Sequence, residues 1–193
     1  TGALAGNDKI YEDVFNQSGV IRARSLRDML EFARGIPVLP TPKGENVVII
    51  TGAGGSGVLL SDACIDNKLS LMTIPPDLDA AFRKFIPPFG AAGNPIDITG
   101  GEPPITYVNT VKLGLEDPRI HALILGYWHT IVTPPMVFAR NMVEVKNEMK
   151  AKGIEKPIVA SLAGDIEVEE AADYLYQNGI VAYAYSTEIP VAV

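Results

Sequence analysis

The stretch VVIITGAGGSGVLLSDACI, Val47 to Ile65, places an apolar β-like run directly before a glycine-rich turn and a helix-like run. Four glycines fall within the six residues from 52 to 57. Glycines let a chain turn tightly and approach a ligand closely, and a helix start offers free N–H groups and the positive end of its dipole. The pattern predicts a strand, a turn and a helix from about Gly57, with a bound anion at the helix start.

Residues 52–57 also match G-x-G-x-x-G, the motif of dinucleotide-binding turns. That function needs an acidic residue at the end of the second strand, and the sequence MTIPPD has Pro75 and Pro76 there, with Asp77 at the start of the next helix. No G-K-[ST] follows the turn, which excludes a P-loop. A phosphoryl group or other small anion, a dinucleotide, and a turn without a ligand all remain open at this point.

Strand-like and helix-like runs alternate after residue 45. The expected strands are NVVIIT, LSLMTI, IHALILGYW, PIVASL and IVAYAY; the expected helices span about 57–67, 77–86, 105–116, 135–152 and 166–178. Alternation of this kind favours βαβ crossovers, and continuous apolar strands indicate helices on both faces. The sequence therefore predicts an α/β fold: an open, mostly parallel, five-stranded, flavodoxin-like (Rossmann-like) sheet.

A helical appendage is expected before this sheet. Asn7 can cap a helix from about Asp8 to Ser18, and Ser25 can cap a second helix that runs to about Arg34. The sequence GIPVLPTPKGEN that follows is a linker by its prolines and glycines. We divide the chain into an appendage at 1–36, a linker at 37–45 and the flavodoxin-like domain at 46–193.

Ligands in such sheets bind beyond the carboxyl ends of the strands. The segment PPFGAAGNPIDITGGEPP, residues 87–104, is one loop expected there, and the residues that end the third strong strand, GYWHT, are another. In the first loop, Asn94 and Asp97 can hold a turn around Pro95 while Thr99 bonds locally. In the second loop, the bulky side chains Trp128 and His129 reach the edge of the sheet.

Composition limits the class of protein. The net charge of −7 opposes binding to duplex nucleic acid, and no stretch is long and apolar enough to span a bilayer. Cys64 is the single cysteine, which fits a reducing compartment such as the cytoplasm, and its apolar neighbours indicate a buried thiol. His129 has no second ligand at metal spacing, so no metal site is expected, and His121 reads as a structural histidine at the start of a buried strand.

Three stretches in order resemble the nucleoside-diphosphate-forming acyl-CoA synthetases, the family of ADP-forming acetate–CoA ligases and succinyl-CoA synthetase. They are TGALAGNDKIYEDVFNQSGVIRARSLRDML, VVIITGAGGSGVLLSDACI and GNPIDITGG. The first is similar to the segment that follows the family's phosphohistidine. The second and third are similar to the start of its ligase-CoA domain and to that domain's N-P-x-D-x-T-G loop.

The resemblance implies an enzyme that joins an organic acid to CoA while ATP becomes ADP and phosphate, through an acyl phosphate and a phosphohistidine. The histidine would stand immediately before Thr1, so no catalytic residue is expected in this chain. The implied partners, domains or subunits of an oligomer, are a CoA-binding unit and an ATP-grasp unit. ATP, Mg and CoA serve the full enzyme, and none is expected to be held by this chain. Its two edges look like cuts through a longer polypeptide, and alone it should be inactive.

The resemblance also implies residue roles. The implied phosphate contacts are residues of the glycine turn, and the implied acid contacts lie in the 87–104 loop: Gly54, Gly55, Ser56 and Gly57 for phosphate; Asn94, Asp97, Thr99, Gly100 and Gly101 for the acid. Related enzymes have small residues near the acid where this chain has Trp128 and His129, and this departure favours an acid of a different shape. Two other functions stay open: a noncatalytic, synthetase-like regulatory module, as in acyltransferase fusions, and an unrelated dinucleotide-binding domain.

Overall fold

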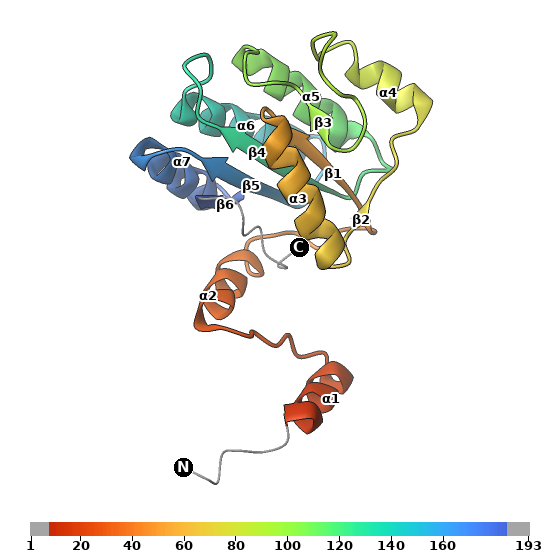
Figure 1. The fold of residues 1–193 in the computed structure, drawn as a ribbon, viewed down its shortest axis with the longest axis vertical. Coiled ribbons are helices and arrows are strands. Elements are labelled where there is room, and N and C mark those ends of the chain that lie inside the picture. Colours follow the sequence, from red (N-terminus) through yellow and green to blue (C-terminus); the bar gives the residue numbers. More distant parts are fainter. Residues whose placement is uncertain (1–7, 185–193) are drawn as a thin grey trace.

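The computed structural model of the chain describes residues 8–184, in which helices and strands alternate (Figure 1). The elements, in chain order, are α1 (Asp8–Ser18), α2 (Leu26–Gly35), β1 (Asn46–Thr51), α3 (Gly54–Asp66), β2 (Ser70–Leu71), α4 (Pro76–Phe82), β3 (Ile96–Asp97), α5 (Pro104–Glu116), β4 (Ala122–Trp128), α6 (Pro135–Ala151), β5 (Ile158–Ala163), α7 (Ile166–Gln177) and β6 (Val181–Ala184). The expectations for Thr1, Asn7 and Tyr185 lie outside the described residues.

The strands form one sheet in the order β2-β1-β4-β5-β6, and every pairing between named strands is parallel. Strand β1 lies inside the sheet because its sequence, NVVIIT, is apolar on both sides of the pleat, and residues 47–51 are all buried. This order is that of an open, doubly wound sheet, which confirms the predicted α/β fold.

One edge of the sheet differs from the prediction of five strands. The expected strand LSLMTI shortens to Ser70–Leu71, which pairs only with the start of β1. The end of β1 pairs instead with Ile96–Asp97, a sixth strand inside the segment that we expected to be an irregular loop. Two short strands therefore share one edge of β1, and the second of them brings the 94–101 loop to the carboxyl end of the sheet.

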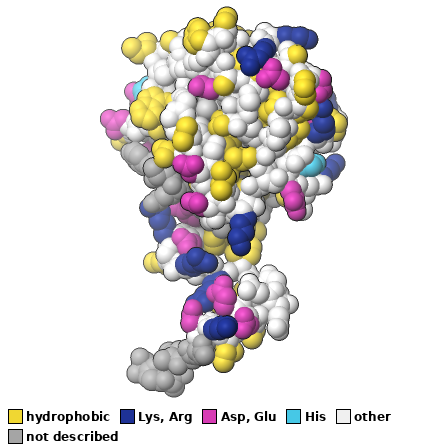
Figure 2. Space-filling view, turned by 45° about the vertical axis from the view of Figure 1, so that its right-hand side comes forward, with side chains coloured by type: hydrophobic (Ala, Val, Ile, Leu, Met, Phe, Trp, Pro, Cys, Tyr) yellow, Lys and Arg dark blue, Asp and Glu magenta, His cyan; other side chains and the backbone are white. Residues whose placement is uncertain are grey.

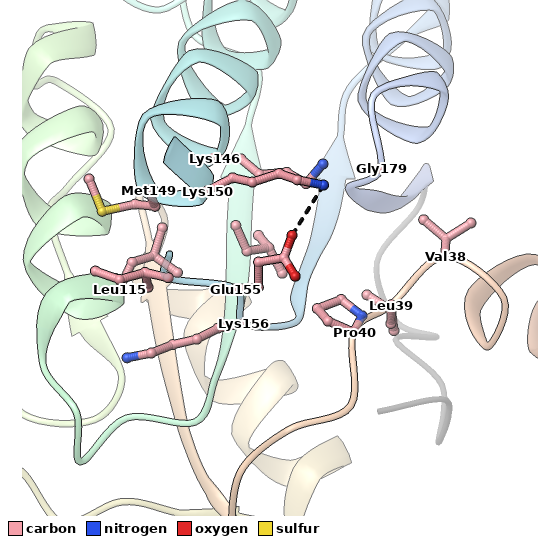
Figure 3. A pocket seen from close by; sticks show the side chains of 12 residues that line it. Val38, Leu39, Pro40, Leu115, Lys146, Met149, Lys150, Glu155, Lys156 and Gly179 are labelled. Carbon is pink, nitrogen blue, oxygen red and sulfur yellow. Dashed lines mark ion pairs between the residues drawn. The ribbon is translucent and has the colours of Figure 1, made fainter. Parts of the chain in front are cut away.

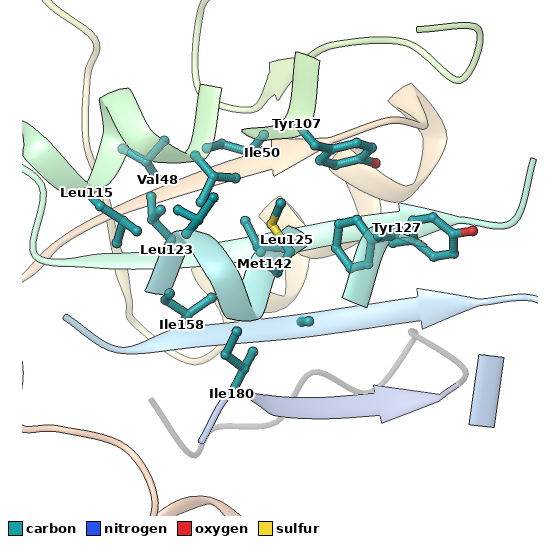
Figure 4. Packing of buried hydrophobic residues seen from close by; sticks show 14 of the residues in the cluster. Val48, Ile50, Tyr107, Leu115, Leu123, Leu125, Tyr127, Met142, Ile158 and Ile180 are labelled. Atoms are coloured by element: carbon teal, nitrogen blue, oxygen red, sulfur yellow. The ribbon is translucent and has the colours of Figure 1, made fainter. Parts of the chain in front are cut away.

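Helices cover both faces of the sheet. Helices α4 to α7 pack on one face, where Val48, Ile50, Leu123 and Leu125 are completely buried (Figure 4). Helix α3 packs on the opposite face through Leu60 and Cys64. Burial at this position raises the pKa of the Cys64 thiol to about 11, as expected of a buried structural thiol.

The first two helices extend away from this body (Figure 1). No residue of α1 is buried, and Arg22 holds the helix by ion pairs with Asp8 and Glu12. Side chains of both charges gather over the appendage (Figure 2). Ser25 caps α2 as predicted, with the hydroxyl accepting from Asp28 N at 3.0 Å. These contacts fix the appendage largely through polar groups.

The end of α2 touches the body. Its Arg34 guanidinium lies 4.6 Å from the centre of the Tyr176 ring and 3.5 Å from the Asp173 carboxylate. The predicted structural role of His121 is confirmed at the opposite end of the linker, where its Nδ1 accepts from Asn46 N at 3.0 Å. No helix within residues 8–184 is long and apolar enough to cross a membrane.

Candidate anion site at the carboxyl edge of the sheet

The first turn of α3 is open to solvent. The N-cap residue, Ala53, has an extended backbone (φ −144°, ψ 108°) and no side chain caps the helix. Gly54 and Gly55 are exposed, and the first turn contains no acidic residue. The first N–H groups of a helix have no partner inside the helix, so these amides and their partial positive charge face the surface.

Hydrogen bonds of Thr51 and of the neighbouring strands fix the turn before α3. The buried hydroxyl of Thr51 donates to Ala53 O and accepts from Ala53 N, both at 3.0 Å. On either side, Gly52 N donates to Gly126 O at 3.1 Å and Ile98 N donates to Thr51 O at 2.8 Å. The helix start is therefore fixed by bonds to its two neighbouring strands before any ligand arrives.

The glycines of this turn have different surroundings. A Cβ on Gly52 would lie 2.4 Å from the Tyr107 hydroxyl oxygen, and a Cβ on Gly57 would lie 3.0 Å from Thr51 Cγ2 and 3.2 Å from Pro95 Cβ. A Cβ on Gly55 would meet nothing within 4 Å. The outer glycines thus let the backbone pack closely, while Gly55 leaves the surface of the turn bare.

The prediction that the helix begins at about Gly57 is wrong. The helix begins at Gly54, and Gly57 N already donates to Ala53 O at 3.0 Å, as the first bond of the helix. Gly57 is buried against Pro95, so neither its amide nor a side chain placed there faces the open turn. The amides available to an anion are those of Gly54, Gly55 and Ser56.

Asn94 has a structural role that occupies its whole amide. Its Oδ1 accepts from Ile49 N at 3.0 Å, and its Nδ2 donates to Val47 O at 2.8 Å and to Met72 O at 3.1 Å. The side chain lies on the edge of β1 between the two short strands, where Val47 O also accepts from Met72 N at 3.0 Å. Both amide hydrogens of Asn94 serve the sheet, so the expected contact between Asn94 and the acid receives no support from its side-chain donors and stays a prediction.

Asp97 lies between the 94–101 loop and the start of α3. Its Oδ1 accepts from Thr99 N at 2.8 Å, and Thr99 has a left-handed backbone with φ of 64°. Its Oδ2 lies 2.8 Å from the position of a Cβ on Gly54, and a Cβ on Gly100 would lie 3.1 Å from Gly52 O. The 97–100 segment and the start of α3 thus form adjoining walls of one surface.

Trp128 and His129 diverge at the end of β4. Trp128 is 56% exposed at the carboxyl edge. His129 turns to the neighbouring strand and helix: its N donates to Ala163 O at 2.9 Å and its Nε2 lies 3.5 Å from Glu167 Oε2. The next residue, Thr130, lies closer to the loop, with its Cγ2 3.5 Å from the position of a Cβ on Gly100.

Two tyrosines that the sequence reasoning missed form the base of this edge. The Tyr107 hydroxyl donates to Gly126 O at 3.0 Å, and the Tyr127 hydroxyl donates to Thr133 O at 2.6 Å (Figure 4). Burial raises the pKa of both phenols well above their ordinary value, so both remain neutral donors. Their only signal in the sequence is a polar atom on an otherwise apolar residue.

The described residues include no group of three or more His, Cys, Asp or Glu side chains placed to hold a metal ion. The surface offers backbone amides and hydroxyl groups, with the Asp97 carboxylate in one wall. The amides suit an anion.

The family model described as "Ligase-CoA domain" matches residues 47–193. The alpha subunit of acetate–CoA ligase [ADP-forming] I from Pyrococcus furiosus is 40% identical over 183 residues, which cover 95% of this chain and 39% of the relative. The chain also resembles the solved structure of a Ca. Korarchaeum cryptofilum protein described as dinucleotide-forming acetyl-coenzyme A synthetase 1. Its apo form has a TM-score of 0.90 and 35% identity over 98% of this chain and 41% of that one.

A second structure of the Korarchaeum synthetase, in complex with phosphate and ADP, has a TM-score of 0.88 and 35% identity over 96% of this chain and 39% of that one. The chain therefore spans about two fifths of the length of these relatives. The similarity includes the extended pair α1 and α2, since it covers nearly all of the chain.

Proposed function

The chain belongs to the Ligase-CoA domain family, and from that premise we propose that it is part of an ADP-forming acyl-CoA synthetase. The proposed reaction has three transfers. A histidine nitrogen takes the terminal phosphoryl group of ATP and releases ADP. A carboxylate oxygen of the acid then takes the phosphoryl group from the histidine, and the sulfur of CoA attacks the resulting acyl phosphate and releases phosphate.

One observation carries this proposal: the first turn of α3 is exposed, uncapped and free of acidic residues at the carboxyl edge of the sheet. In the proposed reaction, the amides of Gly54, Gly55 and Ser56 hold the phosphoryl oxygens while the group is attached to the histidine. A helix N-terminus stabilises an anion with fixed dipoles, and dipoles held in place before the reaction need no reorganisation during it.

The 97–101 segment would bind the acid. The left-handed turn at Thr99 presents the backbone of Thr99, Gly100 and Gly101 next to the start of α3, so a carboxylate bound there would be close to the phosphoryl group. Trp128, half exposed at the same edge, would limit the size of the acid. Asp97 positions this loop through its bond to Thr99 N rather than touching the acid.

The other participants would come from the remainder of the enzyme. We propose a CoA-binding unit, an ATP-grasp unit and the phosphohistidine, the last placed immediately before Thr1, together with ATP, Mg and CoA as the ligands of those units. The proposed setting is the cytoplasm, and the proposed assembly is an oligomer of these domains or subunits.

Phosphoenzyme labelling tests the proposal. The full-length protein is incubated with Mg-ATP labelled on its terminal phosphate, and acid-labile, base-stable label is counted. The proposal predicts label that disappears when the acid and CoA are added together. The absence of label in an ATP-binding preparation would instead favour the noncatalytic regulatory module.

The structure offers little for a dinucleotide. The expected ribose partner would be an acidic group after β2, and Asp77, at the start of α4, is paired with Arg119 at 2.8 Å. Arg119 holds the pKa of the Asp77 carboxyl below its ordinary range, so this charge is committed to the ion pair. Saturable binding of NAD or FAD would overturn this conclusion.

A further inference from the structure

A cavity of about 220 Å³ lies at the amino-terminal edge of the sheet, away from the start of α3 (Figure 3). The linker segment 38–40 forms one wall. The ends of α5 and α6 and residues 154–156 form the other. The cavity is therefore built where the linker crosses the body, and it is separate from the candidate anion site.

The floor of the cavity belongs to the main hydrophobic core. Leu115, Met149 and Ile158 line it, and they are only 2%, 1% and 4% exposed. Side chains packed so tightly do not collapse into the space beside them. These three side chains therefore fix the shape of the cavity, and the apolar surface open to a small aliphatic group comes from the half-buried residues Val38, Leu39, Pro40 and Ile154.

Three lysines and one glutamate surround this floor. Lys146 Nζ donates to Asn178 O at 2.7 Å, and Lys156 Nζ donates to Asp117 O at 2.7 Å. Lys150 Nζ lies 3.1 Å from Glu155 Oε1 (Figure 3). Each ammonium group has three donors, so every one of them retains N–H groups beyond the bond that it makes here.

The positive charges are crowded. Burial lowers the pKa of Lys146, and the nearby charge of Lys150 lowers it further. Burial also lowers the pKa of Lys156. The ammonium groups of Lys146 and Lys150 lie side by side, whereas that of Lys156 points away from them and is held by Asp117 O (Figure 3). A bound anion would relieve the repulsion between Lys146 and Lys150, which a single glutamate only partly offsets.

We propose that this cavity is a binding site for a small aliphatic monocarboxylate, with the carboxylate between Lys146 and Lys150 and the hydrocarbon against Val38, Leu39 and Ile154. The apolar lining favours this ligand over inorganic phosphate. The site goes beyond the proposed function and does not rest on it, because it contains none of the residues assigned to phosphoryl transfer.

The test is a titration of the full-length protein with isovalerate, followed by methyl NMR of Met149, Ile154 and Ile158. The neutral isostere isovaleramide and inorganic phosphate serve as comparison ligands. We expect saturable shifts of these methyl groups with isovalerate, weaker shifts with the amide and none with phosphate. Equal responses to isovalerate and isovaleramide would overturn the proposed role of the lysines.

Two variants of opposite sign sharpen the test. Lys150→Gln should weaken isovalerate binding about fivefold, and Glu155→Gln should strengthen it by a similar factor, because each changes one charge beside the carboxylate. Lys84→Gln is the matched control, an exposed lysine outside the cavity, and should leave the affinity unchanged. The proposal fails if the two cavity variants bind like the control, or if the saturable shifts occur at the start of α3 instead.

Discussion

The starts of α3 and α7 differ, although both helices follow strands of one parallel sheet at the same edge. Helix α7 has Asp165 as its N-cap, with Oδ1 accepting from Ile166 N at 2.8 Å, and Glu167 and Glu169 in its first turn. Helix α3 has Ala53 as its N-cap, no capping side chain and no acid. Helix α7 neutralises its own dipole with a cap and first-turn acids, whereas α3 has no acid of its own, and the carboxylate beside its start is that of Asp97, whose Oδ2 lies 2.8 Å from the position of a Cβ on Gly54.

The difference has an energetic cost that the fold offsets locally. A missing N-cap costs about 1 kcal/mol, and a glycine inside a helix costs about as much again relative to alanine. The hydroxyl bonds of Thr51 and the close packing of Gly57 on Pro95 stabilise the turn from behind. A weak helix start that is supported in this way fits the anion site proposed above.

An acidic N-cap on α3, like that of α7, should have the largest effect on phosphoenzyme labelling. Ala53→Asp should cap the helix and stabilise the protein by about 1 kcal/mol, because the backbone of residue 53 is already extended. The same carboxylate would occupy and repel the site of the phosphoryl group. We expect phosphoenzyme labelling to fall by about 100-fold or more, measured beside urea unfolding.

Ala53→Asn separates capping from charge. It offers a similar side-chain oxygen without a negative charge, so stability should rise as in Ala53→Asp while labelling is reduced far less. If Ala53→Asp labelled as well as the unmodified enzyme, the open start of α3 would have no role in holding the phosphoryl group.

The second prediction concerns two glycines of the same turn. Gly57→Ala should destabilise the protein by about 1–3 kcal/mol, because its Cβ meets Thr51 and Pro95 at 3.0–3.3 Å. Gly55→Ala should stabilise it by about 0.5–1 kcal/mol, since its Cβ meets nothing within 4 Å. Urea unfolding of both variants measures the contrast, and equal changes would show that the two positions are not distinguished by packing.

The third prediction concerns the N-cap of α7, Asp165, which has no counterpart at the start of α3. Asp165→Ala should cost about 1 kcal/mol of stability through the loss of the bond to Ile166 N. Phosphoenzyme labelling should be unchanged, because this helix start carries its own negative charges. A large loss of labelling with intact stability would mean that α7, rather than α3, serves the reaction.

The smallest predicted effect concerns Cys64, which is buried further along α3. Burial raises the pKa of the Cys64 thiol to about 11, above the value of about 8.5 in an unfolded chain. The stabilisation from the neutral thiol is complete below the unfolded pKa and is lost as the pH rises through the folded one. Between pH 8 and pH 9 it should fall by less than about 1 kcal/mol.

Cys64→Ala isolates that contribution, because alanine has no proton to lose. Urea unfolding at pH 8 and pH 9 should show a decline in the free energy of unfolding that is steeper with the cysteine than with alanine. Parallel declines for the two proteins would show that the thiol ionises as easily in the folded state as in the unfolded one.

Apolar runs and caps predicted most of the fold because they depend on neighbouring residues. NVVIIT and IHALILGYW identify the central strands, and Ser25 identifies the start of α2. The two-residue strand Ile96–Asp97 could not be predicted, since its pairing with β1 depends on Asn94 bonding to two strands distant in sequence.

The candidate site was predicted in part. The glycine turn pointed to amides at a helix start, but the pattern could not tell which glycine packs and which is open, because that depends on Pro95 of another loop. It likewise gave no sign that the His129 side chain turns toward Glu167 while Thr130 lies beside Gly100. Side-chain direction at a strand end is set by the neighbouring helix, and a single sequence does not encode it locally.

The most direct test of the central claim is an amide NMR titration of the full-length protein with inorganic phosphate. The account predicts saturable shifts of the N–H signals of Gly54, Gly55 and Ser56, and no comparable shifts of Ile166 and Glu167. Equal shifts at the two helix starts, or none at the start of α3, would contradict it.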